Sequence, residues 1–214
     1  MMTKVIIFDW GRTVAEIDDE WVAKVLKEYG IKRSDARKST GIYRLYSLGK
    51  IKSDKEYLQL YNFWVKPKKK VDKKFLEKLN ILQFKVRPST KLLLKKLKGK
   101  YKLVLATNFV ESWLKRALKM FKLTKTFDLI VVSSSLGVRK PDTRFYDYIC
   151  KRLKVKPSDC MFVSDELNED LSGAKAIGMV TVWLKKRKEP MTFKPDFEIR
   201  SLPEILKILN ASHA

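Results

Sequence analysis

The fold follows from one stretch near the N-terminus, Lys4-Val5-Ile6-Ile7-Phe8-Asp9-Trp10-Gly11-Arg12-Thr13. Its first half is a short apolar run rich in β-branched residues, which predicts a buried strand. Asp9 follows the run directly, and in an open parallel sheet functional groups gather at the carboxyl ends of the strands. The stretch alone leaves two interpretations open, because Asp9 is either a catalytic acid or the cap of the turn that leaves the strand.

From about residue 15 to residue 86 the apolar residues recur with helical spacing. Helices are predicted near residues 19–29, 42–48, 53–64 and 75–82, and no strand is expected among them. The lysines between residues 66 and 74 are expected to be a solvated loop, which is also the best local candidate for a rim that attracts anions. A group of aromatic residues fits a helical core better than a surface for stacking bases. Its members are Tyr43, Tyr46, Tyr57, Tyr61, Phe63 and Trp64.

From Pro88 onward, predicted helices and strands alternate along the chain. Strands are expected at residues 101–106, 127–133, 160–164, 179–184 and 197–199, with helices in the connections between most of them. This alternation predicts right-handed βαβ crossovers and a parallel sheet. The chain is therefore expected to be an α/β protein with helices on both faces of its sheet and a helical insertion after the first strand.

Composition narrows the classes of function. A chain of 214 residues with 45% hydrophobic content fits a domain with a large insertion. It has neither an apolar run that could cross a membrane nor a signal-peptide pattern, so we expect a cytoplasmic protein with no membrane partner. Cys150 and Cys160 are expected to be buried, reduced thiols. The single histidine, His213, is near the C-terminus, so we expect no histidine ligand or general base.

The chain is strongly basic, with 47 Lys and Arg against 24 Asp and Glu and a net charge of +23. Such a charge attracts nucleic acid, anionic membranes or phosphorylated substrates. Because the basic residues are spread along the whole chain, nucleic-acid binding as the primary role is not the favoured interpretation. The sequence leaves the oligomeric state open.

Polar residues follow four of the predicted strands, and their motifs resemble those of the haloacid dehalogenase-like (HAD) hydrolase superfamily. The motifs are Phe8-Asp9-Trp10-Gly11-Arg12-Thr13, Ala106-Thr107-Asn108, Val138-Arg139-Lys140-Pro141-Asp142, and Phe162-Val163-Ser164-Asp165 through Asp170 to Gly173-Ala174. The resemblance runs from about Val5 to Leu202. It implies a Rossmann-like core domain of residues 1–14 and 87–214, with residues 15–86 as a helical cap domain.

The resemblance implies how the acids would act. Asp9 would be the nucleophile that accepts a phosphoryl group, forming an aspartyl-phosphate that water then hydrolyses. Mg²⁺ would be the cofactor, held by Asp9, the backbone carbonyl of Gly11 and Asp165. Asp170 would be either a further metal ligand or an orienting acid. The alternative for Asp165 and Asp170 is that they cap helices.

The resemblance also implies roles for the neutral and basic residues. Thr107 and the backbone N–H of Asn108 would donate hydrogen bonds to the phosphoryl oxygens. Lys140 would neutralise the charges of Asp9 and the phosphate. The alternatives are that Thr107 merely satisfies a strand end and that Lys140 is solvated.

Two positions depart from the pattern of the resembled phosphatases. A second Asp is usual two residues after the nucleophile, where it protonates the leaving oxygen, but Gly11 stands there. Loss of a general acid typically costs about 10² to 10⁴ in rate. Arg12 replaces a usual glycine, and its side chain would either contact the substrate phosphate or point to solvent. Asp18 or Asp19 could supply the missing acid, although helix capping is the favoured role for both.

The favoured function is therefore a Mg²⁺-dependent phosphatase that is slow, or selective for its leaving group, on a small phosphorylated or anionic substrate. One alternative within the superfamily is hydrolysis of a carbon–halogen bond, since a halide leaves without a proton. Another is hydrolysis of a carbon–phosphorus bond, which needs a Schiff-base lysine. A third alternative is a non-catalytic module that keeps the fold and binds another molecule, such as nucleic acid.

Overall fold

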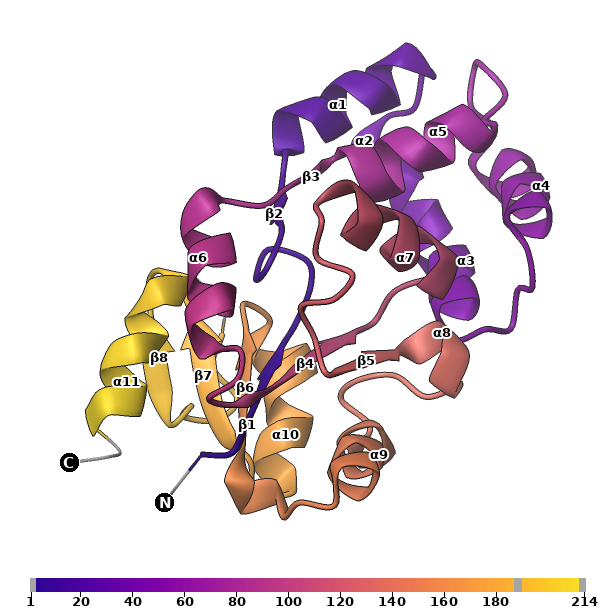
Figure 1. Ribbon diagram of the computed structural model, residues 1–214. Helices are drawn as coiled ribbons and strands as arrows, with labels where there is room; N and C mark the ends of the chain where they lie inside the picture. The colour runs from indigo at the N-terminus through magenta and orange to yellow at the C-terminus, as the bar shows by residue number, and fades with distance from the viewer. Residues whose placement is uncertain (1–2, 187–189, 212–214) are drawn as a thin grey trace.

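Strand β1 (Val5–Phe8) runs through the middle of a parallel sheet in the computed structural model, which describes residues 3–186 and 190–211 (Figure 1). Within those residues the sheet has six strands in the order β5-β4-β1-β6-β7-β8. The other strands are β4 (Lys102–Thr107), β5 (Leu129–Val132), β6 (Cys160–Ser164), β7 (Val180–Leu184) and β8 (Phe197–Ile199). The predicted α/β class is confirmed, and every predicted strand is present.

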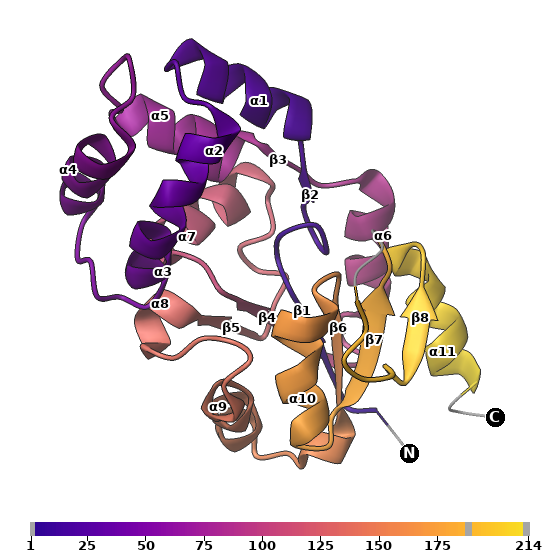
Figure 2. The ribbon, with the colours of Figure 1, turned by 180° about the vertical axis from the view of Figure 1, so that it is seen from behind.

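Helices cover both faces of the sheet, as Figure 2 shows from behind. Alternate residues of β1 face opposite sides, so Ile6 and Phe8 belong to one buried cluster and Val5 and Ile7 to another. The first cluster includes residues of α6 (Pro88–Leu97), α7 (Glu111–Met120) and α11 (Ile205–Ala211). The second includes residues of α9 (Thr143–Leu153) and α10 (Ser172–Ala176). Shorter helical segments are α8 (Ser133–Leu136), η3 (Pro157–Asp159), η4 (Leu167–Leu171) and η5 (Leu202–Glu204).

The order of the strands creates a crevice at the end of β1. Strands β4 and β6 flank β1 on opposite sides, and Phe8 is in register with Leu105 of β4 and with Val163 of β6. The chain builds one half of the sheet and then crosses β1 to build the other half. Ligands of open α/β sheets bind at the carboxyl ends of strands at such a switch point.

Residues 15–86, called here the helical segment, lie beyond the carboxyl end of β1 (Figure 1). Their helices are α1 (Asp19–Glu28), α2 (Arg33–Ala36), η1 (Arg37–Ser39), α3 (Thr40–Ser47), α4 (Asp54–Val65), α5 (Lys73–Glu77) and η2 (Lys78–Leu82). The expectation that no strand occurs here is wrong, because β2 (Glu16–Ile17) and β3 (Phe84–Lys85) pair antiparallel where the chain enters and leaves the segment. Two residues are too few to produce a visible strand period.

The aromatic residues of the helical segment divide into two groups. Tyr46 and Tyr57 pack on the buried ring of Trp113 from α7, at centroid distances of 5.2 and 5.7 Å. They confirm the predicted core. For Phe63 and Trp64 the prediction is wrong, because these side chains are 66% and 59% exposed.

Other expectations from composition have mixed outcomes. Cys150 and Cys160 are buried free thiols, as predicted. No helix among the described residues is long and apolar enough to cross a membrane. His213 lies outside the described residues.

Candidate active site

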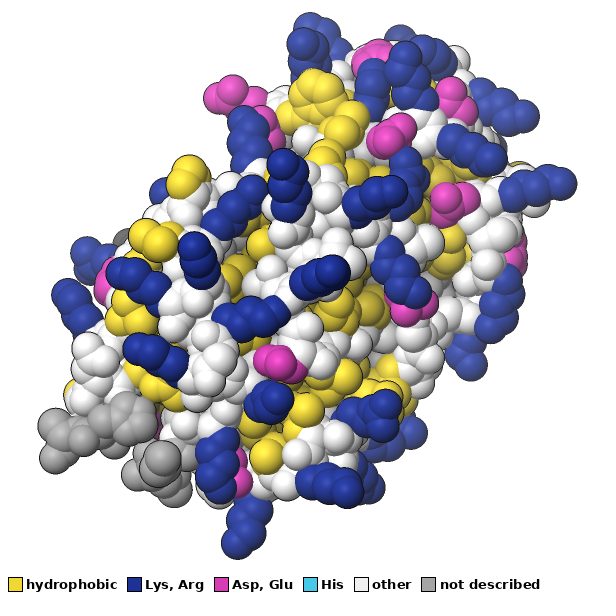
Figure 3. All heavy atoms as spheres, in the orientation of Figure 1, with side chains coloured by type: hydrophobic (Ala, Val, Ile, Leu, Met, Phe, Trp, Pro, Cys, Tyr) yellow, Lys and Arg dark blue, Asp and Glu magenta, His cyan; other side chains and the backbone are white. Residues whose placement is uncertain are grey.

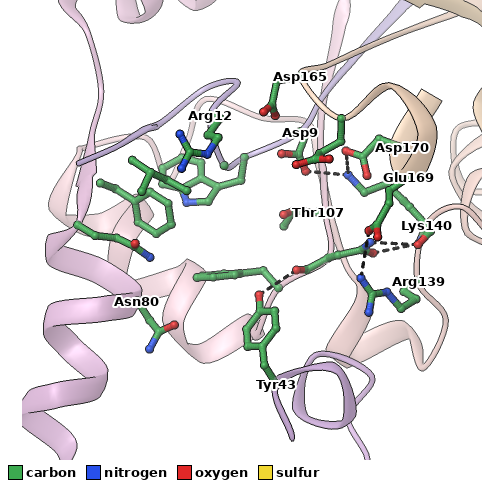
Figure 4. A pocket seen from close by; sticks show the side chains of 18 residues that line it. Asp9, Arg12, Tyr43, Asn80, Thr107, Arg139, Lys140, Asp165, Glu169 and Asp170 are labelled. Atoms are coloured by element: carbon green, nitrogen blue, oxygen red, sulfur yellow. Dashed lines mark hydrogen bonds and ion pairs between the residues drawn. The ribbon is translucent and has the colours of Figure 1, made fainter. Parts of the chain in front are cut away.

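The polar residues at the strand ends meet in one cavity. Asp9 follows β1, and its backbone N–H donates to the carbonyl oxygen of Val163 on β6, at 3.1 Å. Because β4 and β6 flank β1 in parallel, the residues that end these strands reach the same edge of the sheet. The cavity has a volume of about 390 Å³, and all eight residues singled out in the sequence line it (Figure 4). They are Asp9, Gly11, Arg12, Thr107, Asn108, Lys140, Asp165 and Asp170.

Lys140 is a buried cation, with a side chain 1% exposed. Its Nζ donates hydrogen bonds to Oδ1 of Asp9 at 2.7 Å, to Oδ2 of Asp170 at 2.6 Å and to the carbonyl oxygen of Ala106 at 3.0 Å. An ammonium group has three N–H donors, so these contacts use all of them. The alternative that Lys140 is solvated is therefore wrong, and its charge is fixed beside Asp9.

The pKa values of this group reflect burial and charge together. Burial raises the pKa of Asp9 to about 6; the Lys140 ammonium acts in the opposite direction, and the Asp170 carboxylate adds to the rise. Burial by itself lowers the pKa of Lys140, but Asp170 and Asp9 outweigh that effect and raise it. Lys140 therefore stays protonated at neutral pH and faces two carboxyl groups.

Two donors fix the carboxylate of Asp170. Its Oδ2 accepts from Lys140 and from Oγ of Ser164, the latter at 2.7 Å. Neither Asp165 nor Asp170 is the residue that caps η4 or α10, so the alternative of helix capping does not hold. The contacts of Asp170 favour the orienting role over the role of a metal ligand. Ser164 directly precedes Asp165 in the fourth motif, but it is not among the site residues predicted from the sequence.

Asp165 is held by the first motif and by β7. Its Oδ1 accepts from Oγ1 of Thr13 at 3.4 Å, and its backbone N–H donates to the same hydroxyl at 3.1 Å. Nε1 of Trp183 donates to the carbonyl oxygen of Asp165 at 3.1 Å. Thr13 was quoted in the first motif without a role, and it joins the ends of β1 and β6.

Asn108 has a second contact that the sequence did not predict. Its side-chain Oδ1 accepts from the backbone N–H of Lys140 at 2.9 Å, and its Nδ2 donates to the carbonyl oxygen of Lys140 at 3.1 Å. These two hydrogen bonds fix the loop that carries Lys140. Thr107 is buried at the end of β4 and lines the cavity. Helix α10 approaches the same loop closely at Gly173. Only glycine fits there, because a Cβ would lie 2.1 Å from the carbonyl oxygen of Pro141.

Arg12 lines the cavity with a side chain that is partly exposed and paired. Its guanidinium pairs with both carboxylate oxygens of Asp19, at 2.7 and 3.1 Å, while its side chain lines the cavity. Asp19 is therefore an ion-pair partner, whereas Asp18 caps α1 by accepting from the backbone N–H of Trp21. Arg12 has a φ of 55°, a left-handed conformation that costs a side chain about 1–2 kcal/mol. That conformation explains why glycine is usual at this position.

Gly11 leaves room beside Asp9. A Cβ added to Gly11 would meet Cδ1 of Ile17 at 3.9 Å, an ordinary van der Waals contact. Two further acids, Glu166 and Glu169, line the cavity. Oε2 of Glu169 forms an ion pair with Nη2 of Arg139 at 3.6 Å. Arg139 lies within the third motif, and Glu166 and Glu169 lie within the span of the fourth, but none of the three was assigned a role from the sequence.

The helical segment forms the far wall of the cavity (Figure 4). Its lining residues are Ile17, Tyr43, Asn80, Gln83 and Phe84. The hydroxyl of Tyr43 donates to the carbonyl oxygen of Asn108 at 3.1 Å, so α3 contacts the loop after β4. The only sequence signal for Asn80 and Gln83 is that polar residues interrupt the apolar spacing near residue 82.

The donors in the cavity suit a hard divalent cation. Asp9 and Asp165 supply carboxylates from two neighbouring strands, and Gly11 supplies backbone between them. No cluster of three or more His, Cys, Asp or Glu side chains that could hold a metal occurs among the described residues. Mg²⁺ commonly binds one or two carboxylates and fills its remaining positions with water and phosphate oxygens. The residues present therefore fit Mg²⁺ better than a metal that needs a full protein cage.

Comparisons with known proteins agree with this geometry. A family model described as haloacid dehalogenase-like hydrolase matches residues 3–178. The chain is 37% identical over 89 residues to glyceraldehyde 3-phosphate phosphatase from Methanopyrus kandleri, covering 39% of this chain and 38% of that protein. It is 34% identical over 120 residues to (S)-2-haloacid dehalogenase 4A from Burkholderia cepacia, covering 54% and 52% respectively. The chain thus spans about half the length of these curated relatives, or less.

A solved structure shares the fold. It is an HAD-family enzyme from Bacteroides thetaiotaomicron, an Asp-to-Ala mutant in complex with magnesium and inorganic phosphate. The TM-score is 0.74 at 19% identity, and the match covers 87% of this chain and 96% of that one. At this identity the likeness shows the fold alone.

Proposed function

The chain belongs to the haloacid dehalogenase-like hydrolases, and from this we propose that it is a Mg²⁺-dependent phosphatase for a small phosphorylated metabolite. One observation carries the proposal. The carboxyl groups of Asp9 and Asp165 line one cavity, and the Lys140 ammonium lies 2.7 Å from Asp9. Two anions, a nucleophilic carboxylate and a phosphate, can meet there only if cationic charge is already in place.

In the proposed reaction a carboxylate oxygen of Asp9 attacks phosphorus, and the bond from phosphorus to the leaving oxygen breaks. Thr107 and the backbone N–H of Asn108 donate to the phosphoryl oxygens, and Lys140 holds Asp9 in place. Water then attacks the phosphorus of the aspartyl-phosphate, which releases phosphate and regenerates Asp9. Mg²⁺, bound by Asp9, Asp165 and the carbonyl of Gly11, supplies positive charge that offsets the repulsion between phosphate and carboxylate.

Gly11 sets the leaving group that the site accepts. No carboxyl group stands two residues after Asp9, so the leaving oxygen must depart without a proton from that position. The leaving groups of acyl phosphates and of phosphate esters of acidic alcohols depart without a proton more readily than those of alkyl phosphates. The proposed enzyme is therefore selective for activated esters, and about 10² to 10⁴ slower on alkyl esters than an enzyme with the acid.

We also propose that the helical segment acts as a cap that selects the substrate. Ile17, Tyr43, Asn80, Gln83 and Phe84 face the site from this segment, and the β2–β3 pair joins it to the core. Segments that close over an active site commonly exclude water and set specificity.

Carbon–halogen hydrolysis is the second candidate, supported by the dehalogenase relative and by Gly11, because a halide needs no proton. The position of Asp165 in the cavity favours the phosphatase over this candidate, because displacement of a halide by Asp9 requires no metal-binding carboxylate.

The test uses the purified protein with p-nitrophenyl phosphate, with Mg²⁺ and with a chelator, and in parallel with 2-chloropropionate. We expect Mg²⁺-dependent release of phosphate that the Asp9→Asn variant lacks. Release of chloride without metal, or no release of phosphate, would contradict the proposal.

A further inference from the structure

Helix α4 presents a pair of aromatic side chains to solvent on the side away from its packed face. Tyr57, Tyr61 and Val65 recur at helical spacing and are buried, whereas Phe63 and Trp64 are 66% and 59% exposed. The two exposed rings contact each other, with centroids 5.3 Å apart and planes at 90°. The fold does not need these rings, because the opposite side of α4 already supplies the packing.

A lysine-rich loop is fixed directly beside the rings. Six lysines occur between residues 66 and 74. Asn62 of α4 holds the loop, because its Nδ2 donates to the carbonyl oxygen of Val71 at 3.1 Å and its Oδ1 accepts from the N–H of Val71 at 2.8 Å. The loop is further bound at Lys69, whose N–H donates to the carbonyl oxygen of Tyr29. The backbone that carries the lysines is therefore fixed next to the end of α4 that carries the rings.

The positive charge of this surface is largely unneutralised. Among the described residues, Lys69 is the member of the loop that forms an ion pair, at 3.9 Å from Glu28. Asp72, whose Oδ1 accepts from the N–H of Phe75 and from the hydroxyl of Tyr29, is the single acid in this stretch, so it offsets only part of the charge of the six lysines. Lys and Arg side chains also dominate the charged surface on the face shown in Figure 3.

We propose that the α4–α5 surface binds single-stranded nucleic acid. This surface is made of Phe63, Trp64, Lys66, Lys68, Lys70, Lys73 and Lys74, all of them exposed. Bases stack on exposed aromatic rings in a sequence-tolerant way, and neighbouring lysines contact the phosphates. A single strand offers free base faces to the rings, whereas a duplex hides them.

Other occupants fit the surface less well. A second copy of this chain would bring lysines against lysines at a net charge of +23 per copy. A bilayer would attract the lysines, but it offers no planar base for the two exposed rings to stack on. None of the residues of the α4–α5 surface lines the cavity at Asp9, so this inference is independent of the proposed phosphatase.

The test measures fluorescence anisotropy of a labelled oligothymidine of about 12 nucleotides with the full chain at several salt concentrations. Five phosphate contacts predict a slope of log K against log salt of about −3.5 for a single strand. Phe63→Ala/Trp64→Ala should weaken binding roughly tenfold or more, since stacking is lost. The matched control is Leu92→Ala, an exposed apolar residue of α6 flanked by lysines, which should leave affinity unchanged.

A second pair of variants separates this surface from the overall charge. Lys70→Gln/Lys73→Gln/Lys74→Gln should reduce the size of the salt slope by about 2. Lys91→Gln/Lys95→Gln/Lys96→Gln removes the same charge from the exposed side of α6 and should change the slope little. Circular dichroism and phosphatase activity of each variant check that the fold is intact.

Several results would overturn the proposal. Equal losses in the α4–α5 and α6 variants would mean binding by net charge alone. Binding of a duplex as tight as that of the single strand would exclude stacking. Binding of phosphatidylserine vesicles without binding of the oligonucleotide would assign the surface to lipid. Self-association that Phe63→Ala/Trp64→Ala abolishes, without oligonucleotide binding, would assign it to a second copy.

Discussion

The two walls of the cavity hold their side chains in different ways. At the strand ends, Asp9, Lys140 and Asp165 are buried, and hydrogen bonds from several elements fix their positions. The helical segment meets them with Tyr43, whose hydroxyl donates to the carbonyl oxygen of Asn108, and with Asn80, whose Nδ2 donates to its own helix at Leu76. A rigid wall can position charges for a reaction, whereas a less constrained wall can vary with the substrate.

The same difference separates two regions of α4. Its packed face contributes to the core around Trp113, and its outer face carries the exposed rings of Phe63 and Trp64. The proposed catalytic residues are therefore buried, whereas three of the residues proposed to recognise the substrate, Tyr43, Asn80 and Gln83, are half-buried.

Lys140→Met tests the rigid wall most severely. It leaves Asp9 and Asp170 buried without their shared cation, so we expect the free energy of unfolding to fall by about 3–5 kcal/mol and phosphatase activity to be lost. Urea denaturation and initial rates measure both. Lys95→Met, at an exposed position of α6, should stay within about 0.5 kcal/mol of wild type. A stable, active Lys140→Met protein would contradict the claim that Lys140 holds the strand-end wall in place.

Gly11→Asp should supply the general acid that is absent from the strand-end wall of the cavity. The cavity has room for the side chain, and a carboxyl group there could protonate the leaving oxygen. We expect turnover of alkyl phosphates to rise by about 10² to 10⁴, with a much smaller change for aryl phosphates. Gly11→Asn, of similar shape without an ionisable proton, is the control. An equal rise in both variants would show that proton transfer is not the missing function.

Binding of Mg²⁺ should depend on pH through Asp9. Its pKa of about 6 in the metal-free protein, raised mainly by burial, means that the carboxyl group takes up a proton as pH falls through that value. Protonated carboxyl groups do not bind metal, so the Kd for Mg²⁺ should rise about tenfold per pH unit below about pH 6 and stay nearly constant above it. Calorimetric titration at about pH 7 and about pH 5 measures the change. A Kd that is the same at both values would place the metal away from Asp9.

Two tryptophans should show the contrast between the outer face of α4 and the core against which its other face packs. Trp64→Ala removes an exposed ring and should change the free energy of unfolding by no more than about 0.5 kcal/mol. Trp113→Ala removes a fully buried ring and the donor to Asp54, and should cost about 3–5 kcal/mol. Thermal denaturation compares the two. Similar costs would mean that α4 packs with its outer face inward.

The sheet and the site were predictable because their signals are local. A short β-branched run ending in Asp9 marks a buried strand, and the parallel arrangement brings Thr107 and Asp165 to the same edge. The resemblance to a known family added the roles of Asp9 and Lys140.

The remaining features depend on tertiary contacts that no local pattern encodes. Arg12 has a left-handed backbone and pairs with Asp19, so only Asp18 of the two expected caps fills that role at α1. Helical spacing in α4 does not say which of two apolar sides is buried, so Phe63 and Trp64 were misassigned to the core.

Trapping of the enzyme during turnover tests the central claim most directly. The purified protein is mixed with Mg²⁺ and an aryl phosphate, quenched in acid within one turnover, and digested for mass spectrometry. We predict a phosphoryl adduct on Asp9 that disappears as turnover is completed. A phosphoryl group on another residue, or turnover without any adduct on the peptide that contains Asp9, would contradict the account.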